Sequence, residues 1–178
     1  MDFDLILVDS SRKIADLTVE QIGNNQKIFT ELYDYTMLQK KQFAMRSSRV
    51  FALLAEKYPS LMIPFFEKIV FNLETLTDES VKRNFIWILR KYYWHKNENI
   101  LGKLIDTCFK FLISEKEAIS VRAHSLEILH KIAKKEPAII PELLSTLEFV
   151  SINASSGLKS CCKKVYKSLN NKNVYNNF

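Results

Sequence analysis

The residues of this chain that could carry chemistry are few, and their spacing does not suit a metal site. Its three histidines are His95, His124 and His130. The last two stand six positions apart, so on one helix they would point in different directions rather than toward one metal ion. The adjacent Cys161 and Cys162 have no second cysteine pair with which to complete a zinc site. We therefore expect no bound metal.

Sequence motifs of enzymes and cofactor sites are also missing. The chain contains no glycine-rich phosphate loop, no Gly-x-Ser-x-Gly turn and no His-Glu-x-x-His helix. We therefore expect no catalytic residue and no cofactor, and a protein whose task is to bind a partner.

The strongest candidate for a binding site lies along a helix predicted over residues 78–95. Arg83, Trp87, Arg90 and Trp94 follow one another at i, i+4, i+7 and i+11, which places them on one side of that helix. The opposite side carries the apolar residues expected to enter the core. Arginine and tryptophan form cation–π pairs and are enriched in the energetic centres of protein interfaces. These four residues are therefore predicted to contact a partner.

The preceding helix has a similar side. The matching positions there hold Ser47, Phe51, Leu54 and Tyr58. Phe51 and Tyr58 complete the predicted partner-binding set. Two alternatives to a partner site stay open, because helices within residues 11–38 could cover these side chains and a second copy of the chain could bind them.

Helices must position these residues, because the chain has only three glycines and four prolines and its apolar residues recur at helical spacing. Asp78 is the expected N-cap of the helix that carries the arginines and tryptophans, and Pro137 is expected to open a later helix. The run Leu5–Val8 is the one stretch that could be mistaken for a strand. The predicted helices cover residues 11–22, 25–38, 41–57, 60–74, 78–95, 98–113, 117–134, 138–149 and 157–169.

The helices form pairs that repeat along the chain. Equivalent positions in successive repeats lie 36, 40 and 37 residues apart and hold Met45, Val81, Val121 and Leu158. Pro64 and Pro141 then take matching places in the second helices. Cys161 aligns with His124 in this register, and we expect the cysteine to pack in the core.

One stretch of the repeat carries a family pattern. It resembles the acid…Val-Arg-x-x-Ala pattern of HEAT repeats, and its residues are Glu117, Val121, Arg122, Ala123, Leu126, Leu129 and Ala133. The resemblance covers about residues 41–169. Ser47 and Ser48 depart from the family, because they are polar where its pattern has apolar or small packing residues. The layout is also similar to short bacterial HEAT-like proteins that sometimes carry the name adenylosuccinate lyase.

The resemblance implies an all-α fold: a right-handed α-solenoid of antiparallel helix pairs, also described as an armadillo-like α–α superhelix. We expect a single domain over residues 1–169. Residues 1–39 would form capping helices and residues 40–169 the repeats. The asparagine-rich tail over residues 170–178 is expected to fray.

Charge is distributed unevenly between the two sets of helices. The first helices of the pairs and the last helix, counted with their flanking residues as 40–57, 78–96, 115–136 and 157–172, hold 20 Lys/Arg and 7 Asp/Glu, a net charge of 20 − 7 = +13. The rest of the chain holds 6 and 13, a net charge of 6 − 13 = −7. The resemblance puts the first helices on the convex side, so we expect a basic convex face and a near-neutral to acidic concave face. These lysines either solvate exposed helices or bind an anionic partner.

The function expected from these observations is a non-enzymatic scaffold that binds a protein, which the basic helix set suggests to be acidic. A homodimer is a further option. A lyase would need a Ser-Ser-x-Met-Pro-x-Lys loop, and none of the three Ser-Ser pairs is followed by Met-Pro-x-Lys. The alternative is a DNA-binding module or one that repairs alkylated bases, although the predicted second helices carry only Lys68, Lys103 and Lys110 as cations.

The expected compartment is the cytoplasm. The first residues are acidic where an export signal is basic, and the run Leu5–Val8 is too short to span a membrane. The odd number of cysteines, three, argues against a disulfide framework.

Overall fold

The computed structural model describes residues 1–93 and 96–173, with side chains up to Asn170, and these ranges contain helices and no strand. The chain divides into two compact units, Met1–Tyr92 and Tyr93–Phe178. Each unit is described by itself. The single domain predicted over residues 1–169 stays a prediction.

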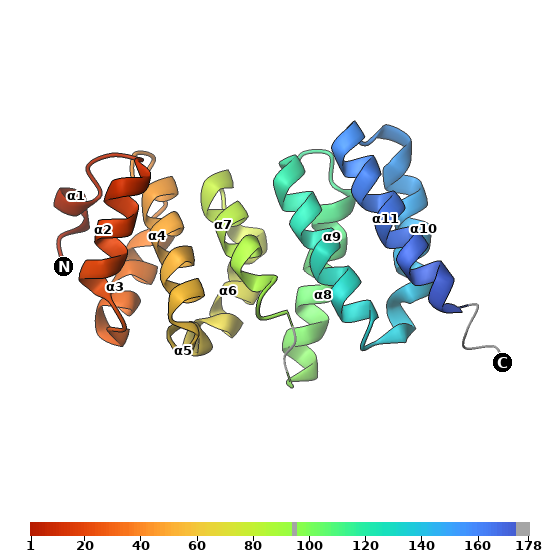
Figure 1. Ribbon diagram of the computed structural model, residues 1–178, viewed down its shortest axis with the longest axis horizontal. Helices are drawn as coiled ribbons and strands as arrows, with labels where there is room; N and C mark the ends of the chain where they lie inside the picture. Colours follow the sequence, from red (N-terminus) through yellow and green to blue (C-terminus); the bar gives the residue numbers. More distant parts are fainter. Residues whose placement is uncertain (94–95, 174–178) are drawn as a thin grey trace. The chain divides into compact units, whose positions relative to one another are not determined.

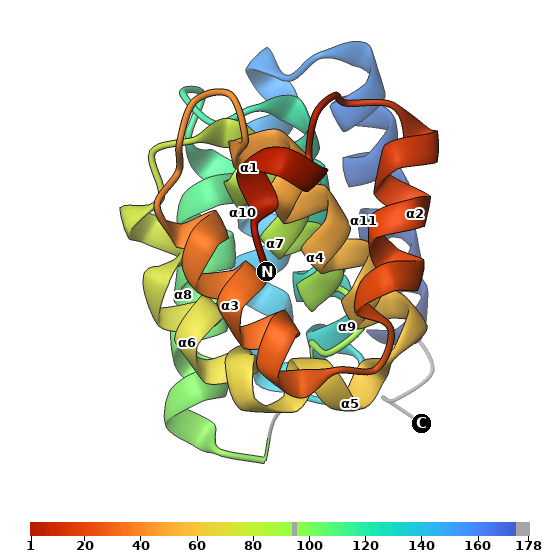
Figure 2. The ribbon, with the colours of Figure 1, turned by 90° about the vertical axis from the view of Figure 1, so that its left-hand side faces the viewer.

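The first unit is built around α4. Its helices are α1 (Phe3–Ile6), α2 (Arg12–Ile22), α3 (Gln26–Met37), α4 (Ala44–Lys57), α5 (Pro59–Met62), α6 (Phe66–Asn72) and α7 (Glu79–Leu89), with short 3-10 turns at Ile63–Phe65 and Leu73–Thr75. Helix α4 packs against α2, α3 and α7. Figure 2 shows α2 and α4 on one side of this unit and α3 and α6 on the other. Because α4 has neighbours on several sides, more than one of its faces is buried.

The second unit contains two long helix pairs. Its helices are α8 (Glu98–Ile113), α9 (Ile119–Ala133), α10 (Ile140–Asn153) and α11 (Ser156–Asn173), with a 3-10 turn at Pro137–Ile139. Helix α8 packs against α9, α10 packs against α11, and α9 also contacts α11 (Figure 1). Short connections between successive helices suit antiparallel neighbours.

Most predicted helices are present, although several of their bounds differ. Asp78 caps α7 as predicted, because its carboxylate accepts hydrogen bonds from the amides of Ser80 and Val81 at 2.9 and 3.1 Å. The helix predicted over 60–74 is broken into short helices and 3-10 turns around Pro64. The run Leu5–Val8 begins within α1. Helix α11 continues to Asn173, past the predicted end at residue 169, and residues 174–178 lie outside the described range, so the fraying predicted for residues 170–178 stays a prediction.

The core of the first unit contains a cluster of five aromatic rings contributed by α3, α4, α7 and the turn before α6. Its members are Phe29, Tyr33, Phe51, Phe65 and Phe85. The rings of Phe29 and Phe51 stack with their centroids 4.3 Å apart, and those of Phe51 and Phe85 lie 5.3 Å apart. Burial raises the pKa of Tyr33 to about 12. Such pairs add about 0.5–1.5 kcal/mol each to the stability gained by burial alone.

Two arginines at matching repeat positions bind main-chain carbonyls. Arg122 of α9 is buried, and its Nε donates to the carbonyl oxygen of Leu112 at 3.0 Å. That carbonyl lies in the last turn of α8, where carbonyls have no partner within the helix. Arg46 of α4 donates to the carbonyls of Leu7 and Val8 at 2.8 and 3.0 Å. The arginine of the repeat pattern therefore fastens α4 to the segment at Leu7 and Val8, and α9 to the end of α8.

The two serines that depart from the family pattern are buried with their hydroxyls bonded. Ser47 donates to the carbonyl of Ala44 at 3.3 Å, and Ser48 donates to that of Met45 at 3.2 Å. The Ser48 hydroxyl also accepts a hydrogen bond from Asn84 of α7 at 2.8 Å. The departure therefore joins α4 to α7 without leaving a buried polar atom unsatisfied.

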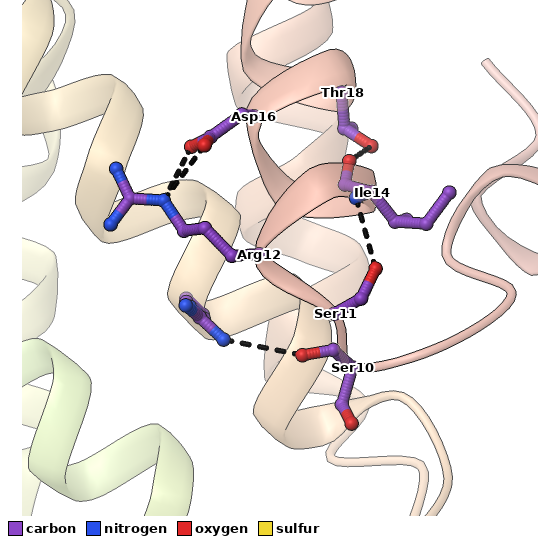
Figure 3. A network of polar contacts seen from close by, with 7 residues as sticks. Ser10, Ser11, Arg12, Ile14, Asp16 and Thr18 are labelled. Atoms are coloured by element: carbon purple, nitrogen blue, oxygen red, sulfur yellow. Dashed lines mark hydrogen bonds and ion pairs between the residues drawn. The ribbon is translucent and has the colours of Figure 1, made fainter.

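The segment before α2 is held by α4 as well. Ser11 is the N-cap of α2 and accepts from the amide of Ile14 at 3.2 Å (Figure 3). The carbonyl of Ser10 accepts from Arg49 of α4 at 3.2 Å. On the exposed side of α2, Arg12 Nε lies 2.8 Å from the carboxylate of Asp16. The Arg49–Ser10 hydrogen bond therefore fixes the start of α2 against α4.

Candidate functional site

The predicted partner-binding set does not form one surface, because Phe51 lies in the core. Its side chain has no exposed area, and it is stacked against Phe29 of α3. Ser47 and Leu54, at the neighbouring positions of the predicted stripe, are buried too. The prediction that Phe51 contacts a partner is therefore wrong. The alternative that an N-terminal helix covers this side of α4 accounts for it.

Helix α7 and its C-cap residue hold three of the six predicted residues, Arg83, Trp87 and Arg90. Arg83 is exposed, while Trp87 and Arg90 are half-buried. The guanidinium carbon of Arg90 lies 5.7 Å from the centre of the Trp87 ring, and Arg90 Nε donates to the Trp87 carbonyl at 3.1 Å. The predicted Arg–Trp cation–π pair is therefore present. We refer to Arg83, Trp87 and Arg90 as the α7 cluster.

Neighbouring residues of α7 fix the orientation of this cluster. Asn84 and Lys91 flank Trp87 by about one helical turn, and both bond to α4. Lys91 Nζ lies 2.6 Å from the carboxylate of Glu56, at a site where both side chains are partly exposed. Trp87 therefore lies on the same side of α7 as the contacts with α4. This position explains why its indole is half-buried rather than fully exposed.

Helix α7 is shorter than the helix predicted over residues 78–95, so within the described residues it carries the predicted stripe as far as its C-cap, Arg90. Helix α7 ends at Leu89, and the amides of Lys91 and Tyr92 bond to carbonyls only three residues back. The Tyr92 hydroxyl donates to the carbonyl of Ala55 at 2.8 Å, which anchors the chain to α4 just after the helix. Trp94 lies outside the described residues, so its predicted contact stays a prediction.

Tyr58 belongs to α4 rather than to α7. It is the C-cap residue of α4, is half-buried, and has Lys57 Nζ 5.5 Å from its ring centre. Its place in the partner-binding set also stays a prediction.

The described residues contain no group of three or more histidine, cysteine or carboxylate side chains arranged to hold a metal ion. The cysteines differ in environment. Cys108 and Cys162 are buried, and burial raises the pKa of each thiol. Cys161 is exposed, so the prediction that it packs in the core is wrong. Its neighbour Cys162 takes the core position, because Cys162 is the repeat equivalent of the buried Ser125, whereas Cys161 is the equivalent of the half-buried His124.

This difference predicts how the thiols react. We expect a mild excess of a thiol reagent such as Ellman's reagent to modify Cys161 rapidly in the native protein, because a thiol must be exposed and ionised to react. Cys108 and Cys162 are expected to react only after unfolding in urea. Cys161→Ser should abolish the rapid reaction of the native protein and leave the reaction of Cys108 and Cys162 in urea unchanged. Rapid reaction of two thiols in the native protein would contradict the assigned environments.

A second surface was not predicted from the sequence and lies in the second unit. Helices α10 and α11 border a groove of about 430 Å³, lined by side chains that include Leu147, Cys162, Lys163, Tyr166 and Lys167. Two large apolar side chains of α10 are also exposed, Phe149 by 62% and Ile152 by 69%. Their positions could have been noted in the sequence, but the groove depends on how two helices meet.

No described helix is long and apolar enough to cross a membrane.

Comparison with known proteins identifies the family of this repeat. Residues 6–169 match the family described as HEAT repeat domain. No curated protein and no solved structure matches the chain. The match spans most of the chain, and both units consist of packed helices with the repeat pattern in register. The chain belongs to the HEAT repeat family.

Proposed function

We propose that this protein is a non-enzymatic scaffold of the cytoplasm that binds another protein through the α7 cluster. The observation that carries the proposal is the Trp87–Arg90 pair at the surface, with exposed Arg83 one turn away on the same helix. Tryptophan and arginine contribute disproportionately to binding energy in protein interfaces. The pair is held in place by its own hydrogen bond and by the contacts of α7 with α4, so little conformational freedom is lost on binding.

The proposal is tested by capturing partners on the immobilised full chain and comparing variants. We expect a protein retained by the wild type to be lost with Arg83→Glu and with Trp87→Ala. The charge reversal alters only an exposed side chain, so it reports on binding even if the tryptophan variant loses stability. A matched control is Lys13→Ala with Leu17→Ala, since these exposed residues are a basic and an apolar one and stand four positions apart on a helix of the first unit, as Arg83 and Trp87 do.

Three outcomes count against the proposal. Capture that survives Arg83→Glu and Trp87→Ala removes the α7 cluster as the site. A mobility shift of duplex DNA at low salt that weakens as salt rises would favour the nucleic-acid alternative, because release of counterions makes such binding salt-dependent. Association of the chain with itself that is lost in the same two variants would assign the cluster to a homodimer.

A further inference from the structure

The groove between α10 and α11 is apolar at its floor and basic along one edge. Leu147 of α10 and Cys162 of α11, both buried, contribute to its lining. The ring of Tyr166 and the aliphatic stems of Lys163 and Lys167 add apolar surface. Lys163 and Lys167 are exposed. The groove therefore offers contact area to an apolar side chain with positive charge beside it.

The groove lies on a side of α11 away from α9. Ser168 of α11 meets His130 of α9, with Oγ and Nε2 3.1 Å apart. Lys163, Lys167 and Asn170 follow at i, i+4 and i+7 along the groove, on the side roughly opposite Ser168. Among the described residues α11 packs against α9 and α10, and these two helices leave the groove open.

The apolar surface continues from the groove onto α10. Ile152 follows Glu148 by four residues, and Glu148 lines the groove, so the two share one side of the helix. Ile152 and its neighbour Phe149 are among the most exposed large apolar residues of the second unit. Glu148 accepts a hydrogen bond from the Tyr166 hydroxyl at 3.1 Å, which joins the two edges of the groove. An occupant of the groove could therefore also cover Ile152.

The charge beside the groove has a single sign on α11. Residues 156–173 contain no Asp or Glu. Lys159, Lys163 and Lys167 stand at i, i+4 and i+8, so they form a row on the groove side. All three are exposed. Carboxylates of an occupant with helical spacing would meet this row one by one.

We propose that this groove binds an amphipathic helix of a partner protein, whose apolar side chains enter the groove and whose carboxylates pair with Lys163 and Lys167. The groove follows α11 over residues 162–170, on the order of 12 Å at 1.5 Å per residue, which is about two turns of a docked helix. The proposal rests on the proposed function as a protein-binding scaffold, and it adds a second surface and the chemistry of what binds there.

The probe is a synthetic helical peptide with leucine on one side and glutamate at i, i+4 beside it, labelled with a fluorophore. Anisotropy of the labelled peptide is followed as the full chain is added. We expect saturable binding that weakens at least tenfold in the Lys163→Glu, Lys167→Glu double variant. The matched control is Lys134→Glu with Lys164→Glu, since these lysines are exposed in the same unit and do not line the groove. The control should change the affinity by less than threefold.

Two altered peptides separate the contributions of charge and apolar contact. Replacing the leucines by serine keeps the charge and should abolish binding, and replacing the glutamates by lysine should do the same. Equal weakening by the two double variants, or undiminished binding of the serine peptide, would show that only general attraction between opposite charges is involved, and it would overturn the proposal.

Tighter binding of duplex DNA of the same charge, lost in the Lys163→Glu, Lys167→Glu double variant, would instead assign the groove to nucleic acid. Self-association lost in that variant would assign it to a second copy.

The result also distinguishes this groove from the α7 cluster. Trp87→Ala should leave peptide binding unchanged, because the cluster belongs to the other unit. If the peptide fails to bind but partner capture still depends on Trp87, the inference about the groove is overturned and the proposed function of the α7 cluster is not. Peptide binding without any Trp87-dependent capture would leave the groove standing and remove the α7 cluster.

Discussion

Phe51→Ala is expected to lower the free energy of unfolding by about 3–5 kcal/mol, the range for removing a buried phenylalanine side chain. Phe51 has no exposed area and touches the rings of Phe29, Phe65 and Phe85 from three other segments. The cavity left by its ring cannot close without moving several helices, because protein interiors are close-packed. Urea denaturation followed by circular dichroism measures the change.

The matched control is Phe149→Ala, which removes a phenylalanine that is 62% exposed. Its expected effect is within about 0.5 kcal/mol of the wild type, as is usual for surface positions. A loss below about 1 kcal/mol for Phe51→Ala would mean that the ring is not part of the core. It would restore Phe51 as a candidate for partner contact.

Arg122→Met is expected to cost about 2 kcal/mol, because it removes the donor to the Leu112 carbonyl and leaves that group at the buried end of α8 without this partner. Methionine keeps most of the aliphatic stem, so the change reports mainly on the hydrogen bond and the charge. The effect is read from the urea midpoint at constant slope.

The control for this variant lies at the same register position of the next repeat. Lys159 is exposed on α11, and Lys159→Met is expected to change stability by no more than about 0.5 kcal/mol. Similar effects of the two substitutions would contradict the assigned role of Arg122 in fastening α9 to α8.

Much of the fold follows from local signals in the sequence. Asp78 marks the start of α7 because its carboxylate accepts amide hydrogen bonds, and Pro137 opens the turn before α10 because proline suits a first helical turn. The Val-Arg pair at residues 121 and 122 also marks a real interaction, since one residue is buried in the core and the other binds α8. These features depend on neighbours close in sequence or on the repeat spacing.

The candidate site was predicted less well, because helical spacing shows which side chains share a side of a helix and not which sides are covered. Phe51 lies on the side of α4 opposite the expected core side, yet α3 covers it. Helix α4 packs against α2, α3 and α7, so it buries positions that an amphipathic pattern with one core side and one solvent side assigns to solvent. Ser47 and Ser48 gave a hint, since small residues permit close packing.

Helical spacing also could not predict where α7 ends or that a groove forms in the second unit. Tyr92 binds the carbonyl of Ala55, and that tertiary contact follows the end of the helix near Leu89. The groove forms where side chains of α10 and α11 leave space between them. Each feature depends on contacts between residues far apart in the chain.

The measurement that tests the central proposal most directly is calorimetric titration of the captured partner with the full chain. We expect Arg83→Glu to weaken the affinity at least tenfold, which corresponds to about 1.4 kcal/mol. The Lys13→Ala, Leu17→Ala control should bind as tightly as the wild type. Equal affinities for wild type and Arg83→Glu, with the fold of both intact by circular dichroism, would contradict the assignment of the α7 cluster as the binding surface.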